Sequence, residues 1–175
     1  MKSSKTLIVV VFVAIFAAGA AAQTSRPLAV VKSFYAYDGI RSQVFSRQAI
    51  EARRPWFSKE LYDLFIYELQ RESTSLKKNP TDKPFFGDGL PFRPIDETCK
   101  IGRRTLHKTV RFIFEAGTGR SATVQAIFAF PSPCKDPDTT IYKIKLVNEK
   151  VGWLIDDVLY EDNHALKQDM KRQDY

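Results

Sequence analysis

Three side chains in this sequence are candidates for acid–base chemistry: Asp157, Tyr35 and Tyr37. Asp157 lies in an alternating segment whose apolar face also carries Trp153, Ile155 and Leu159. Strict alternation would point this carboxylate toward the core, where its pKa would rise and it could act as an acid or base. A tyrosine hydroxyl could then donate to a developing oxyanion. The competing interpretation is that Asp157 caps backbone amides or faces solvent, and that both tyrosines pack at the edge of the core.

The sequence shows no other residue set that is typical of catalysis or of metal binding. His107 and His164 are its only histidines, and neither has cysteine, histidine or aspartate neighbours at a metal-ligand spacing. There is no glycine-rich phosphate loop and no nucleophile elbow. We therefore predict no cofactor and no metal site, and we expect His107 to face solvent.

Cys99 and Cys134 are the only cysteines, and we predict that they form a disulfide. A small, even number of cysteines indicates such a bond in an oxidising compartment. Cys99 precedes one predicted strand and Cys134 follows the next, and the beginning of an antiparallel strand lies beside the end of its partner. The other interpretation, a reactive thiol, lacks a nearby histidine or a Cys-x-x-Cys spacing.

The first 22 residues have the three parts of a secretory signal peptide. A short basic stretch precedes an uncharged apolar run over 7–18, and three alanines at 20–22 supply the small residues that signal peptidase recognises. We predict cleavage between Ala22 and Gln23, and a secreted or periplasmic protein that is soluble after this removal. The alternative is an uncleaved anchor, but the apolar stretch is shorter than the ~20 residues that a membrane-spanning helix needs.

The mature chain is moderately basic. Removal of Lys2 and Lys5 with the signal peptide lowers the formal net charge from +7 to +5. The basic pairs have acidic residues nearby and no interleaved aromatic residues, so we expect ordinary solvated surface and no nucleic-acid binding; these pairs are Arg53-Arg54, Lys77-Lys78 and Arg103-Arg104. No cysteine follows the cleavage site to carry a lipid, and we expect no stable membrane anchor after cleavage.

The hydrophobic pattern predicts three helices followed by four strands. Apolar residues at helical spacing occupy 27–38, 46–53 and 58–78, with Ser46 and Ser58 as predicted N-caps. Alternating patterns then predict strands over 105–114, 122–130, 140–148 and 153–160.

Two further segments lie outside these predicted elements. The stretch 80–94 is rich in proline and glycine but also carries phenylalanines, so we expect an ordered loop over the edge of the core and a candidate mouth for a pocket. The tail over 161–175 is polar, and we expect it to fray or to form a short solvated helix.

Four segments, in order, carry a resemblance to a known family: VKSFY at 31–35, RPWFSKEL at 54–61, GDG at 87–89 and GWLIDDV at 152–158. They resemble a bacterial secreted family of unknown function that is itself similar to the nuclear transport factor 2-like (cystatin-like) superfamily. The resemblance covers about residues 28–160 and does not include the two cysteines. It implies an α+β fold in which three N-terminal helices pack on one curved four-stranded antiparallel sheet to form a cone. It also implies a pocket between sheet and helices, and it allows a homodimer through the open face of the sheet.

These observations together predict a signal peptide (1–22), a single α+β domain (23–160) and a polar tail (161–175). We expect an exported, non-catalytic binding or protein-interaction domain whose partner is a protein or a small apolar ligand. The alternative is a small-molecule-pocket enzyme, or a carrier of an apolar ligand, that uses Asp157 with Tyr35 or Tyr37 in a water-poor cavity.

Overall fold

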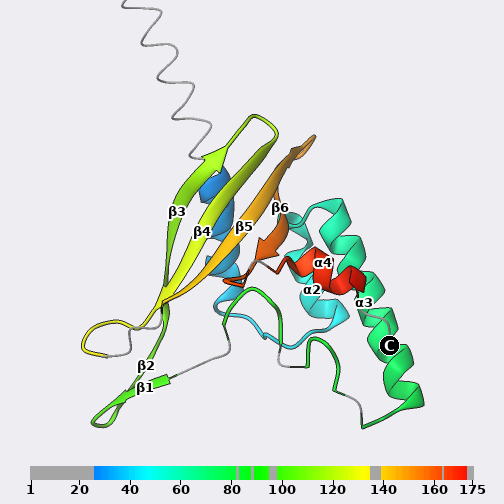
Figure 1. The fold of residues 1–175 in the computed structure, drawn as a ribbon, viewed down its shortest axis with the longest axis horizontal. Coiled ribbons are helices and arrows are strands. Elements are labelled where there is room, and N and C mark those ends of the chain that lie inside the picture. Colours follow the sequence, from blue (N-terminus) through cyan, green and yellow to red (C-terminus); the bar gives the residue numbers. More distant parts are fainter. Residues whose placement is uncertain are drawn as a thin grey trace, which may run out of the picture.

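The computed structural model describes residues 26–172 of the chain, apart from 82, 88, 95–97, 135–138 and 163. The predicted signal peptide and its cleavage site at Ala22 and Gln23 lie outside the described residues. The described part is an α+β structure with four helices, a four-stranded antiparallel sheet and a separate two-stranded hairpin (Figure 1).

Two of the helices begin at the serines that the sequence predicts as N-caps. The Ser46 hydroxyl accepts the N–H of Ala49, and the Ser58 hydroxyl accepts the N–H of Leu61. The helices occupy residues 26–38, α2 (Arg47–Arg53), α3 (Lys59–Lys78) and α4 (Leu166–Arg172), with the 3-10 turn η1 (Arg54–Trp56) between α2 and α3.

The main sheet has the strand order β3-β4-β5-β6, with every neighbouring pair antiparallel. Its strands are β3 (Thr109–Gly117), β4 (Ser121–Ala129), β5 (Thr140–Glu149) and β6 (Gly152–Leu159), and the separate hairpin is β1 (Thr98–Ile101) with β2 (Arg104–His107). The strand predicted over 105–114 is therefore interrupted at Lys108. The interruption occurs because β4 ends at Ala129, opposite Thr109, so the chain before Thr109 pairs with β1 instead.

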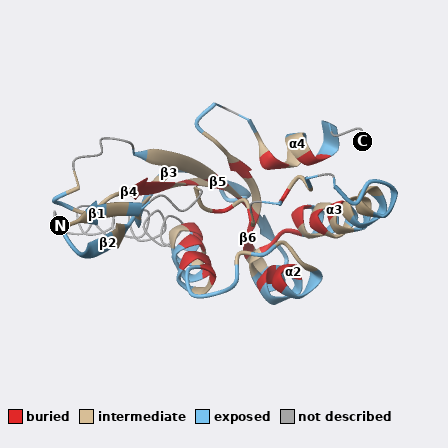
Figure 2. Ribbon diagram, turned by 90° about the horizontal axis from the view of Figure 1, so that it is seen from below, coloured by how far each residue is buried: buried red, intermediate tan, exposed pale blue. Residues whose placement is uncertain are grey.

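The helices and the inner face of the sheet enclose a core that is rich in phenylalanine. Figure 2 shows the buried residues on the sides of the helices that face the sheet. The loop over 80–94 contributes Phe92, which is fully buried with its ring centroid 4.8 Å from that of Phe34 and 5.3 Å from that of Phe57. The described residues of this loop lie over the core edge, as the sequence predicts, because their aromatic side chains remove apolar area from water.

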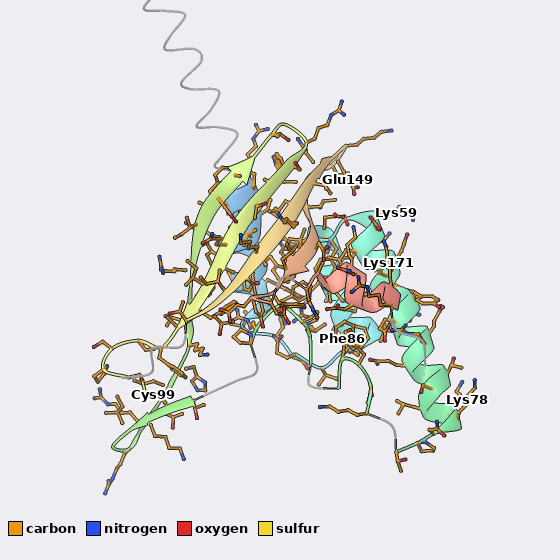
Figure 3. All side chains as sticks on the ribbon, in the orientation of Figure 1. Lys59, Lys78, Phe86, Cys99, Glu149 and Lys171 are labelled. Atoms are coloured by element: carbon orange, nitrogen blue, oxygen red, sulfur yellow. A yellow bond between two sulfur atoms is a disulfide. The ribbon has the colours of Figure 1, made fainter. Side chains whose placement is uncertain are left out.

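The C-terminal segment differs from the solvated tail that its composition suggests. Leu166 and Met170 on α4 are buried in the core, and an isolated bridge joins Leu159 to Ala165. Two lysines of α4 reach back to α3, where the carboxylate of Glu60 accepts hydrogen bonds from Lys167 Nζ (2.6 Å) and Lys171 Nζ (2.7 Å). Figure 3 shows Lys171 lying between α4 and α3.

The predicted disulfide is confirmed: Cys99 and Cys134 are bonded, with a Cα–Cα distance of 6.2 Å. Cys99 lies on β1 and not at the beginning of a strand of the main sheet (Figure 3). Cys134 lies in the segment after β4. The bond therefore fastens the separate hairpin to the main sheet. Within the described ranges, no helix combines the length and the apolar character needed to cross a membrane.

The contact between α4 and Glu60 has a pH-dependent contribution to stability. The two lysine hydrogen bonds lower the pKa of Glu60 from 4.5 to about 2. Since the folded-state pKa is depressed, the stabilisation is present above pH 4.5 and is lost as the pH falls toward 2. The Glu60 side chain is 54% exposed, so we expect Glu60→Gln to lower the free energy of unfolding by at most about 1 kcal/mol at pH 7.

Urea unfolding of the wild type and of Glu60→Gln at pH 7 and at acid pH measures this difference. Asp63→Asn, which removes the exposed ion pair of Asp63 with Lys59 on the same helix, is the matched control. If Glu60→Gln lowers the free energy of unfolding by the same amount at neutral and at acid pH, the hydrogen bonds between Glu60 and the two lysines do not make the pH-dependent contribution.

Candidate functional site

A half-open pocket of about 860 Å³ lies at the end of the sheet where β3 begins and β4 ends. Its wall comes from two loops and from the sheet: the loop after the 26–38 helix, the loop after α3, and side chains of the sheet end that include Phe128, Tyr142 and Tyr160. In Figure 1 both loops pass beneath this end of the sheet. Segments far apart in the sequence thus form one concave surface.

One backbone hydrogen bond joins the two loops, and a side-chain hydrogen bond fixes the first loop to the end of its helix. The N–H of Leu90 donates to the carbonyl of Gln43 (2.8 Å), and the Gln43 side-chain amide donates to the carbonyl of Asp38 (2.9 Å). Gly89 has a φ of +117°, and a Cβ at this position would lie 3.0 Å from the Gln43 carbonyl oxygen. A glycine is required there by both its backbone conformation and the close approach of the loops.

Behind the loops lies a buried charge cluster of one carboxylate and two guanidinium groups. Asp38 is fully buried, and its two carboxylate oxygens accept hydrogen bonds from Arg53 Nε (2.8 Å) and Arg93 Nε (3.0 Å). Gly39 makes room for Arg93, because a Cβ on Gly39 would lie 2.7 Å from Arg93 Nη2. That nitrogen donates to the carbonyl of Tyr35 (3.0 Å).

The two arginines of this cluster have different roles. Arg53 is 1% exposed and uses all three of its side-chain nitrogens, since Nη1 donates to Ala49 and Nη2 to Ser42. The sequence-based expectation of a solvated surface position is therefore wrong for Arg53, because Asp38 compensates its charge inside the protein. Arg93 is 27% exposed and lines the pocket, and its Nη1 has no partner among the residues that the structure describes.

Two tyrosines form the aromatic floor of the pocket. The rings of Tyr142 and Tyr160 meet edge to face with their centroids 5.0 Å apart, and Phe128 lies 5.4 Å from Tyr142. Tyr160 donates its hydroxyl proton to Pro91 (3.2 Å), whereas no described residue is a hydrogen-bond partner of the Tyr142 hydroxyl. Burial, followed by the charges of Glu161 and Asp162, raises the pKa of Tyr142 to about 12, so this hydroxyl is a neutral donor at physiological pH.

The structure does not bring the three candidate acid–base residues together. Tyr35 is buried, and its hydroxyl donates to the carbonyl of Phe92 (2.8 Å). Burial first, and the charge of Asp38 second, raise the pKa of Tyr35 well above its ordinary value. Tyr37 is only partly buried, with its ring 4.8 Å from that of Trp56.

Asp157 occupies a different position from the one that strict alternation implies. Lys145 pairs with Asp157 whereas Leu146 pairs with Ile155, so Asp156 is an extra residue that forms a β-bulge. The bulge reverses the alternation, which leaves Ile155 and Val158 in the core.

The Asp157 carboxylate instead accepts hydrogen bonds from the backbone N–H groups of Val158 (2.8 Å) and Lys167 (3.0 Å). The second of these amides belongs to the first turn of α4, so Asp157 caps that helix. Burial raises the pKa of Asp157, and the two amide hydrogen bonds oppose this rise.

His107 is exposed and contributes to the pocket lining, whereas His164 lies near Asp162 and Asp169 at the start of α4. Within the described part of the chain, no three histidine, cysteine, aspartate or glutamate side chains are grouped in a way that could hold a metal ion.

The cluster of Asp38, Arg53 and Arg93 was not among the sequence-based predictions, although the sequence contains two signals for it. Asp38 lies one helical turn after Phe34 on the apolar face of its helix, and Arg53 follows Ala49 at the same spacing. A charged residue on each of two apolar helix faces, with opposite signs, indicates a buried ion pair. Arg93, in the loop after α3, had no comparable signal.

The pocket offers aromatic contact area and hydrogen-bond donors from rigidly held groups, which is the chemistry of ligand binding. Comparisons of this chain with protein-family models, with curated proteins and with solved structures found no match.

Proposed function

We propose that this protein is an exported, non-catalytic binding domain that takes up a small organic ligand in the pocket between the two loops and the end of the sheet. The pocket itself is the observation that supports this function. Its volume of about 860 Å³ falls within the range of small-molecule sites, roughly 300–1,000 Å³. Its aromatic floor, with a few polar groups at the wall, is the composition that such sites share.

The proposal includes export and a nuclear transport factor 2-like cone. The basic, apolar and small-residue parts of segment 1–22 support export, and a disulfide is a bond that persists in oxidising compartments. The helices over 26–38, α2 and α3 precede the four-stranded sheet in the order that the cone requires. The pocket at one end of the sheet is also consistent with that architecture.

The side-chain contacts favour binding over the alternative of acid–base catalysis. The Asp157 carboxylate is engaged by the amides of Val158 and Lys167, and the Tyr35 hydroxyl is engaged by the carbonyl of Phe92. Neither residue contributes to the pocket lining. The arginines and aromatic rings that line the pocket are better suited to holding a ligand than to exchanging protons with it.

Binding of 2-naphthamide, a neutral aromatic probe, to the exported protein tests this function by fluorescence titration. We expect saturable binding that Tyr142→Ala weakens roughly tenfold, because the substitution removes one of the two tyrosine rings of the aromatic floor. Tyr67→Ala is the matched control, since Tyr67 is 59% exposed on α3 and outside this pocket. Asp157→Asn should leave the affinity unchanged. No saturable binding of 2-naphthamide or of a charged analogue with the same ring system, or equal loss in both tyrosine variants, would contradict the proposed function.

A further inference from the structure

We infer that the ligand of this pocket is an organic anion: its carboxylate binds Arg93 and Arg41, and its apolar body lies against Tyr142 and Tyr160. The inference rests on the proposed function, because it names the chemical class of ligand for the same pocket. Three observations support this inference: the positive charge near the pocket, the free hydrogen-bond donors of Arg93 and the aromatic residues of the lining.

The buried cluster behind the pocket has an excess of positive charge. Asp38 supplies one negative charge to two guanidinium groups, those of Arg53 and Arg93. A charge held away from water is costly unless an opposite charge compensates it. Arg93 is the member of the cluster that reaches the pocket, so an anion bound there would restore the balance.

Arg93 is also oriented before any ligand arrives. Asp38 holds its Nε, and the carbonyl of Tyr35 holds its Nη2, so two hydrogen bonds define the plane of the guanidinium group. The remaining nitrogen, Nη1, keeps its N–H groups free of partners within the described residues. Planar guanidinium groups match the geometry of carboxylates, and a donor that is already ordered loses little entropy on binding.

Arg41 supplies a second cation to the lining of the pocket. Its guanidinium carbon lies 5.0 Å from the centroid of the Tyr37 ring, and no carboxylate of the described residues pairs with it. Lys108, whose Nζ lies 3.5 Å from Thr140 Oγ1, is a third cation in the lining. The described lining contains no aspartate or glutamate. Two arginines, with no carboxylate in the described lining, favour an anion over a neutral or cationic ligand.

The aromatic part of the lining favours an organic anion over an inorganic one. Tyr142, Tyr160 and Phe128 present ring surface that an inorganic ion would leave unused. The Tyr142 hydroxyl, which lacks a described partner, adds a neutral donor beside these rings. An aromatic or aliphatic carboxylate uses both parts of the lining, since its head contacts the arginines and its body covers the tyrosines.

The test compares 2-naphthoate with 2-naphthamide, which has the same ring system and nearly the same shape but no charge. Fluorescence titration at pH 7 and low salt should show that the wild-type protein binds the naphthoate at least tenfold more tightly. Arg41→Gln should weaken naphthoate binding about fivefold more than it weakens naphthamide binding. Arg47→Gln, at an exposed arginine on α2 that does not line the pocket, is the matched control.

Arg93→Gln should remove most of the preference for the naphthoate. Because Arg93 also pairs with Asp38, the circular dichroism spectrum and the melting curve of the Arg93→Gln variant must be measured alongside. If that variant does not fold, Arg41→Gln decides whether the pocket prefers the anionic probe. Equal affinity for the two probes, both weakened by Tyr142→Ala, would overturn this inference and leave the proposed function standing. Tighter binding of 2-naphthylmethylammonium than of naphthoate would also overturn it. Failure of all three probes to bind would contradict both proposals.

Discussion

Replacing Asp38 with asparagine is expected to lower the free energy of unfolding by about 3–5 kcal/mol, as removal of one member of a buried ion pair does elsewhere. Asp38 is fully buried and receives hydrogen bonds from both Arg53 and Arg93. Without its negative charge, the positive charge of Arg53 would remain in the interior with a side chain that is 1% exposed. Urea unfolding followed by circular dichroism measures the loss.

Two further variants distinguish the cost of the uncompensated buried charge from a nonspecific loss of stability on replacing an aspartate. Asp63→Asn removes an exposed carboxylate whose ion pair lies on the surface of α3, and its cost should stay below about 1 kcal/mol. Adding Arg53→Met to Asp38→Asn removes the uncompensated charge and should recover part of the stability. If Asp38→Asn costs no more than the surface control, the buried cluster does not have the assigned role.

The second large effect concerns the disulfide. Replacing both Cys99 and Cys134 with alanine is expected to lower the free energy of unfolding by about 3–4 kcal/mol in the chain-entropy description, given the sequence separation of 35 residues. The β1–β2 hairpin pairs only with itself within the described residues, so the bond is its covalent fastening to the main sheet. Chemical denaturation of the double variant measures the loss of stability.

Hydrogen exchange locates the effect of losing this bond. We expect faster exchange of the hairpin amides over 98–107, with much smaller changes in the inner strands β4 and β5. Reduction of the wild-type protein should reproduce both results. A double variant as stable as the wild type, with unchanged exchange in the hairpin, would contradict the assigned role of the bond.

Features that depend on neighbouring residues could be predicted from the sequence. The starts of α2 and α3 follow from Ser46 and Ser58, because an N-cap acts on amides within the next turn. The alternating segments predicted the strands of the sheet, since side chains on a strand alternate between its two faces. The presence of just two cysteines, together with the predicted export, was sufficient to predict their pairing, although Cys99 lies on β1 and does not flank a strand of the main sheet.

Features that depend on a partner strand could not be predicted in this way. The bulge at Asp156 inserts one residue opposite β5 and reverses the face of Asp157, which a pattern within β6 alone cannot show. The interruption at Lys108 likewise occurs where β4 ends and the chain changes its pairing partner. In α4, the two buried residues Leu166 and Met170 are separated by polar ones, so composition alone suggested a solvated tail.

The sequence by itself determined the α+β class, the helix starts, the alternating strands and the disulfide pair, because caps, periodicity and cysteine count act locally or by composition. Only the tertiary structure determined which residues form the buried cluster and the pocket. Asp38 lies 15 residues from Arg53 and 55 from Arg93, and the pocket joins residues from Gly39 to Tyr160. Groups so distant in sequence meet only after the core has packed, since strand register and loop closure set their positions. The pocket that supports the proposed function is therefore a property of the folded chain.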